Sequence, residues 1–103
     1  MDEEPKLRGG WKKAPELRYI HRSKELEGLG LARDEFERAI NPALKAGEIS
    51  ELMARTAILW FGLNGEKPHT HDEIAQKLGR PTRRVRDEIN YAVQFVLEKK
   101  RTA

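Results

Sequence analysis

The side chains best suited to chemistry gather in one short stretch near the C-terminus. Within eleven residues it holds four arginines with no acid among them, followed by a carboxylate and an amide: Arg80, Arg83, Arg84, Arg86, Asp87 and Asn90. Arginine pairs with guanine or with phosphate, asparagine pairs with adenine, and aspartate accepts a hydrogen bond from cytosine. Three- and four-residue spacing places one set on a common helix face: Arg83, Arg86, Asp87 and Asn90. This pattern favours contact with nucleic acid. A solvated face, with Asp87 paired to Arg83 or Arg84, is the competing interpretation.

The distribution of charge along the chain points to the same region. Residues 1–64 hold 11 Lys/Arg and 11 Asp/Glu, whereas residues 65–103 hold 9 Lys/Arg and 6 Asp/Glu. The C-terminal part therefore accounts for the entire net charge of +3. A local positive patch of this kind favours a polyanionic partner.

Other kinds of chemistry have little support. The absence of cysteine excludes disulfides and thiol catalysis. His69 and His71 have no placed third ligand, so we expect no metal site. The acidic residues between positions 25 and 37 lie in a polar stretch without a pocket to raise a pKa, and Ser23 and Ser50 lack a nucleophile motif. We expect no catalytic residue and no cofactor, and we do not expect an enzyme.

Length and hydropathy limit the class of protein further. A chain of 103 residues forms one domain with a modest core. No apolar run approaches the roughly 20 residues that cross a bilayer. The acidic start of the sequence does not resemble a secretory signal. We therefore expect a cytoplasmic protein with no membrane partner.

Pro5, Gly9 and Gly10 among scattered charged residues predict a flexible arm at residues 1–14. Helix signals then predict a helical segment of unknown role at residues 15–47. Pro15 can begin a helix because its missing N–H costs nothing there. A second helix is expected from about Asp34, with a break or kink at Pro42. The apolar residues at helical spacing are Leu17, Ile20, Phe36, Ile40 and Leu44.

The second half, residues 48–103, predicts three further helices, which makes the fold all-α with four to five helices. Ser50 is a suitable N-cap for the third helix, and Thr70 with Glu73 forms a capping box for the next. Gly79 suits a left-handed C-cap. A short helix, a glycine turn and a longer helix make a helix-turn-helix, in which the first helix braces the second. The apolar contact expected to brace them is that of Ile74 and Leu78 against Val85 and Ile89.

A series of short motifs runs through this half. In chain order they are Phe61-Gly62-Leu63, Thr70-His71-Asp72-Glu73-Ile74, Leu78-Gly79 and Thr82-Arg83-Arg84-Val85-Arg86. Their order and spacing resemble region 4 of the sigma-70 family of bacterial sigma factors, over about residues 50–100. The resemblance implies a bacterial or phage transcription regulator that binds double-stranded DNA through a recognition helix at about residues 82–100. It also implies a contact with the β-flap of RNA polymerase.

The sequence departs from the family pattern in the base-reading positions and in the helix before the turn. Pro81 replaces a Ser or Thr, and the residues at positions 82, 83 and 87 differ from those usual in the family. Ile58 and Trp60 stand where the family often has arginine. Two apolar residues there indicate a different packing partner or a protein interface.

These observations assign expected roles to individual residues. DNA bases would be contacted by Thr82, Arg83, Arg86, Asp87 and Asn90. DNA phosphates would be contacted by Lys77, Arg80, Arg84 and Thr70. Ile58 and Trp60 would contact a protein. The terminal Lys99, Lys100 and Arg101 would either touch the DNA backbone or complement the helix dipole.

Two alternatives to a DNA reader remain open. One is a protein-interaction module that binds RNA polymerase, a sigma factor or an anti-sigma factor without reading DNA. The other is a regulator of a different helix-turn-helix family, such as the LuxR type. The sequence assigns neither the DNA site nor the direction of regulation.

Overall fold

The computed structural model describes residues 15–102 and contains five α-helices in that range. They are α2 (Pro15–Gly28), α3 (Arg33–Lys45), α4 (Glu51–Phe61), α5 (His71–Leu78) and α6 (Thr82–Thr102). No strand occurs between residues 15 and 102, so the predicted all-α fold is confirmed. The predicted flexible arm, residues 1–14, lies outside the described residues. None of the described helices is both long and apolar enough to cross a membrane.

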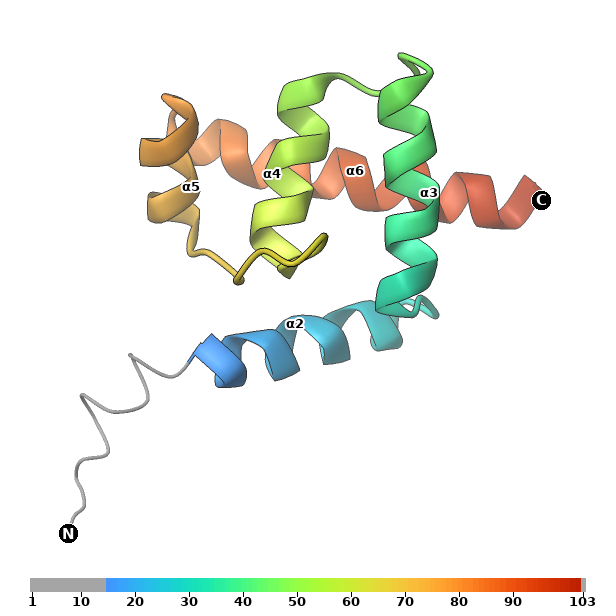
Figure 1. Ribbon diagram of the computed structural model, residues 1–103, viewed down its shortest axis with the longest axis horizontal. Coiled ribbons are helices and arrows are strands. Elements are labelled where there is room, and N and C mark those ends of the chain that lie inside the picture. The colour runs from blue at the N-terminus through green and yellow to red at the C-terminus, as the bar shows by residue number, and fades with distance from the viewer. Residues whose placement is uncertain (1–14, 103) are drawn as a thin grey trace, which may run out of the picture.

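The long helix α6 organises the other elements (Figure 1). α3 and α4 run antiparallel and side by side across α6, with α4 nearer its N-terminal end. α5 packs beside the first half of α6 after a tight turn, and α2 lies across the C-terminal end of α4. The first turns of α6 therefore project from the bundle next to α5, in the arrangement of a helix-turn-helix.

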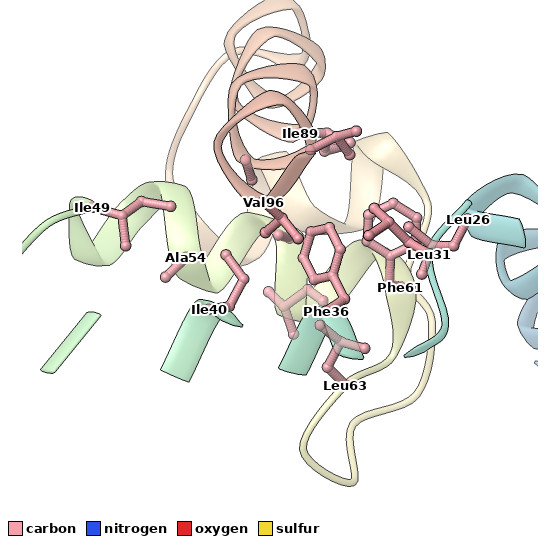
Figure 2. Packing of buried hydrophobic residues seen from close by; sticks show 14 of the residues in the cluster. Leu26, Leu31, Phe36, Ile40, Ile49, Ala54, Phe61, Leu63, Ile89 and Val96 are labelled. Atoms are coloured by element: carbon pink, nitrogen blue, oxygen red, sulfur yellow. The ribbon is translucent and has the colours of Figure 1, made fainter. Parts of the chain in front are cut away.

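One hydrophobic core joins the helices of both predicted segments, residues 15–47 and 48–103. The rings of Phe36 and Phe61 lie 5.2 Å apart at an angle of 51°, which is a favourable tilted aromatic pair. Figure 2 shows these rings between side chains from α2, the α2–α3 turn and α6. The fully buried residues of largest volume are Phe36, Phe61, Leu26, Leu31, Ile40, Leu63, Ile74, Val85, Val96 and Thr56.

Capping side chains place the helix ends where the sequence predicts them. The Ser50 hydroxyl accepts a hydrogen bond of 3.1 Å from the N–H of Met53 at the start of α4. Thr70 accepts at 3.1 Å from the N–H of Glu73, whose carboxylate accepts at 2.9 Å from the N–H of Thr70. This reciprocal pair is the predicted capping box of α5.

Gly62 ends α4 at a position that only glycine fits. Its φ is +69°, in the left-handed region that side chains with a Cβ disfavour. A Cβ atom there would also lie 2.8 Å from the ring carbons of Pro68. The close approach folds the turn 62–70 back onto the end of α4 and so directs the chain into α5.

One expectation for the first half is wrong. α3 continues through Pro42 without the expected interruption, and the carbonyl of Pro42 accepts from the N–H of Ala46 at 2.9 Å. Arg38 and Pro42 are both exposed, so the carbonyl of Arg38, which the missing N–H of Pro42 leaves without its helical partner, is open to solvent. In α2, Leu17 and Ile20 are 41% and 48% exposed, while Arg22 and Leu26 face the core.

Candidate nucleic-acid interface

The first half of α6 has a sharply divided surface. Val85, Ile89 and Ala92 are buried against the bundle. On the opposite side, the exposed side chains include most of those expected to contact bases. They are Arg83, Arg84, Arg86, Asp87 and Asn90. Because the apolar stripe faces the bundle, these side chains point outward.

The arginines on this face have no carboxylate partner within residues 15–102. No ion pair is formed there by Arg83, Arg84 or Arg86. The competing interpretation, in which Asp87 neutralises Arg83 or Arg84, therefore does not describe this structure. Three guanidinium groups remain available to an external anion at the start of one helix.

Arg80 differs from the other three arginines and is not a phosphate contact in this geometry. Its guanidinium forms an ion pair with Glu88, and the two side chains are only 17% and 12% exposed. The reason is that Glu88 lies on the inner side of α6, where an unpaired carboxylate would be costly. We therefore reassign Arg80 from the DNA surface to the interior of the helix-turn-helix.

The remaining residues expected at the interface lie around the turn. Thr70 is half-buried and its hydroxyl caps α5, while Lys77 is exposed in the last turn of α5. Thr82 lies at the start of α6 and its hydroxyl donates to the carboxylate of Asp72 at 3.3 Å. Lys77 is free to reach a phosphate, whereas the hydroxyls of Thr70 and Thr82 already have protein partners.

The expected protein interface at Ile58 and Trp60 is occupied from within the chain. The guanidinium carbon of Arg22 lies 3.3 Å from the centroid of the Trp60 ring. The His71 ring stacks on the same indole with centroids 4.1 Å apart and planes 23° apart. Groups this close to one ring fit only on its opposite faces. Ile58 is half-buried against the core. Trp60 is also only partly exposed, and Arg22 of α2 and His71 of α5 already pack on its ring.

Arg22 and His71 respond electrostatically to this packing. Arg22 donates to the carbonyl of Trp60 and, at 3.0 Å, to that of His69. Burial, together with the charge of Arg18, lowers the pKa of Arg22 to about 10, so it stays charged at neutral pH. Burial lowers the pKa of His71 too, and the positive charges of Arg86 and Arg22 lower it further. The neutral imidazole is therefore favoured beside the arginine-rich face.

Two residues near the interface, Tyr91 and Arg18, were not identified from the sequence. Tyr91 is 60% exposed and lies one helical turn after Asp87, a spacing that the sequence itself displays. Its phenol can donate to a phosphate at the edge of the same face. Arg18 of α2 donates to the carbonyl of Pro68 at 2.9 Å and lies 3.6 Å from the carboxylate of Glu73. That contact joins segments 50 residues apart and has no signal in the local sequence.

Comparison of the chain with protein-family models, curated proteins and solved structures gives no match. The roles of the residues at this surface therefore depend on their geometry, their charge and the resemblance of the motifs at residues 61–86.

Proposed function

We propose that this chain is a cytoplasmic transcription regulator that binds double-stranded DNA, with the first half of α6 in the major groove. The observation that carries the proposal is the set of outward-facing guanidinium groups of Arg83, Arg84 and Arg86, which form no ion pair within residues 15–102, at the start of α6. The resemblance to sigma-70 region 4 supports the same docking geometry.

The proposed contacts fall into two groups. Arg83 and Arg86 are suited to bidentate pairing with guanine, Asn90 to adenine and Asp87 to the amino group of cytosine. Thr82 lies at the N-terminal end of this row, where a recognition helix contacts base edges. Phosphates on either side would be held by Lys77, Arg84 and the backbone around Thr70.

The test is fluorescence anisotropy of labelled duplex DNA titrated with the whole chain at about 50 mM and about 200 mM salt. We expect affinity to fall steeply with salt, because each neutralised phosphate releases counterions. Arg83→Ala/Arg86→Ala should abolish most of the binding. The matched control is Arg38→Ala/Arg101→Ala, which removes two exposed arginines that are paired with Asp34 and Glu98.

The control separates a local site from a general effect of net charge, since both double variants lose the same charge. Equal losses in the two variants would reduce the binding to non-specific attraction. An absence of binding by the wild-type chain at about 50 mM salt would overturn the proposal.

A second candidate function is binding to RNA polymerase or to a sigma or anti-sigma factor, as the resemblance implies. Arg22 already packs on Trp60, so the surface we propose for this function is that of Leu17 and Ile20 on α2, which are 41% and 48% exposed. The test is capture of core RNA polymerase by the immobilised chain. This function predicts that Leu17→Asp/Ile20→Asp loses capture while Arg83→Ala/Arg86→Ala retains it, and the reverse result would contradict it.

A further inference from the structure

An enclosed ion pair connects the turn of the helix-turn-helix to the inner side of its last helix. Arg80 belongs to the turn between α5 and α6, and Glu88 belongs to the second turn of α6. One oxygen of the Glu88 carboxylate pairs with Arg80. The other lies 3.3 Å from the hydroxyl of Thr56 in α4. The pair therefore connects three elements, which are the α5–α6 turn, α6 and α4.

The geometry makes Arg80 the principal partner of Glu88. The Thr56 hydroxyl has one proton to donate, and it is closer to the Leu52 carbonyl, at 2.7 Å, than to Glu88. The guanidinium, by contrast, is planar and directional. Its Nε atom is buried and has no hydrogen-bond partner among the described residues, so within this part of the chain Glu88 orients Arg80.

A charged pair at this depth contributes little to stability. The desolvation of two charges offsets much of their attraction, and apolar side chains of similar volume often replace such pairs without loss. The contacts of Val85, Ile89 and Ala92 already bury the same side of α6. The distinctive property of the pair is therefore that its energy depends on orientation, whereas apolar contacts are non-directional.

We propose that Arg80 and Glu88 are positioning residues that fix the rotation of α6 about its axis. Glu88 directly follows Asp87, and one helical turn separates it from Arg84. A rotation of about 20° would move side-chain tips at the helix surface by about 2 Å. Binding geometries of this kind tolerate only about 0.5 Å. The inference rests on the proposed function, because rotation of α6 affects sequence discrimination only if α6 reads bases.

The test uses Arg80→Met/Glu88→Leu, which replaces the pair with apolar side chains and leaves the net charge unchanged. A preferred duplex is first selected from a random pool by the wild-type chain. Dissociation constants are then measured for the selected and a random duplex at several salt concentrations. We expect the variant to bind random DNA within about twofold of wild type with the same salt slope. Its preference for the selected duplex should fall roughly tenfold or more, as when one good base contact is lost.

Two single variants test the pair further. Glu88→Gln retains the size and a hydrogen-bond acceptor but leaves Arg80 without a counter-charge, so we expect a lower melting temperature and a partial loss of discrimination. Arg80→Lys keeps the charge but not the planar geometry, so it should prefer the selected duplex less strongly than the wild type does. Thermal unfolding reports any change in stability separately.

The outcomes distinguish this inference from the proposed function. If the double variant keeps the wild-type preference, or loses affinity for both duplexes in parallel, the positioning role is wrong and DNA binding stands. If the wild type binds DNA without any preference, the positioning role is also wrong. If the wild type binds no DNA, both proposals fail.

Discussion

The two ends of α6 carry similar numbers of basic side chains in opposite situations. At the C-terminal end, every basic residue has an acidic partner. Lys99 pairs with Glu48 at 2.9 Å, Lys100 with Glu35 at 3.2 Å, and Arg101 with Glu98 at 3.4 Å. At the N-terminal end, the three outward arginines, Arg83, Arg84 and Arg86, have no such partner among the described residues.

This difference shows that the number of basic residues does not identify a nucleic-acid surface. The lysines at the C-terminal end hold α6 to α3 and to the α3–α4 turn, so a phosphate would have to displace a carboxylate there. An anion that binds the arginines at the N-terminal end breaks no ion pair within residues 15–102. If pairing with carboxylates decides which end binds DNA, substitutions at the two ends should change DNA affinity by different amounts.

The largest expected effect is on DNA affinity. Removing Arg83 and Arg86 should cost about 1–3 kcal/mol for each bidentate base contact, which amounts to roughly 30-fold or more for the double variant. Lys99→Ala/Lys100→Ala removes the same charge from the other end and should weaken binding less than about threefold. Anisotropy titrations of both variants measure the contrast. Equal effects would show that pairing does not matter.

A smaller effect is expected in the opposite direction at Asp87. This carboxylate is exposed and has no ion-pair partner among the described residues, so it repels phosphate beside three arginines. Asp87→Asn should increase affinity for random duplex DNA several-fold and reduce discrimination between duplexes. The matched change Glu98→Gln at the other end should alter neither quantity. Unchanged or weaker binding by the Asp87→Asn variant would contradict its position on the DNA-facing surface.

His71 should make stability depend on pH, because its partly buried ring is harder to protonate in the folded state. Burial, Arg86 and Arg22 lower its pKa in the folded state below the ordinary value of 6.5. The unfolded chain therefore binds protons more readily, and the stabilising contribution is present above pH 6.5 and lost as pH falls through the folded pKa. Melting temperatures between about pH 7.5 and 5 should show this loss in the wild type and not in His71→Phe.

The control for this prediction is the exposed His21 of α2. His21→Phe should keep the wild-type dependence of melting temperature on pH. The prediction for His71 fails if His71→Phe keeps that dependence too.

The smallest expected effect is on the paired end itself. The N–H of Ala32 and the ammonium of Lys100 lower the pKa of Glu35, so its stabilising contribution is present above the ordinary value of 4.5 and is lost as pH falls. Glu35→Gln should lower the melting temperature slightly at neutral pH, and the difference should vanish in acid. DNA affinity should stay within about twofold. A large loss of affinity in this variant would mean that the paired end takes part in binding.

The helix boundaries could be predicted from the sequence because their signals are local. Ser50, Thr70 with Glu73, and Gly79 act on backbone groups within a few residues, so their types alone specify the ends of α4 and α5. The outward direction of Arg83 and Asp87 followed from the apolar period of α6 in the same way.

The contacts between distant residues were not predictable from local patterns. Arg22 lies 38 residues from Trp60 in the chain, and no periodicity indicates that a guanidinium would cover the indole. The pairing of Arg80 with Glu88 had a partial signal, since Glu88 follows Val85 by three residues and precedes Ala92 by four. An acid on the apolar face needs a partner, but which of several nearby arginines would serve depended on the tertiary turn.

The most direct test of the central claim is to map the DNA-binding surface by amide chemical shifts of the isotope-labelled chain with and without duplex DNA. The account predicts that the amides whose chemical shifts change lie at residues 82–91 and in α5. The amides of residues 96–102 should keep their chemical shifts. Perturbations confined to α2 or to the C-terminal end of α6 would contradict it.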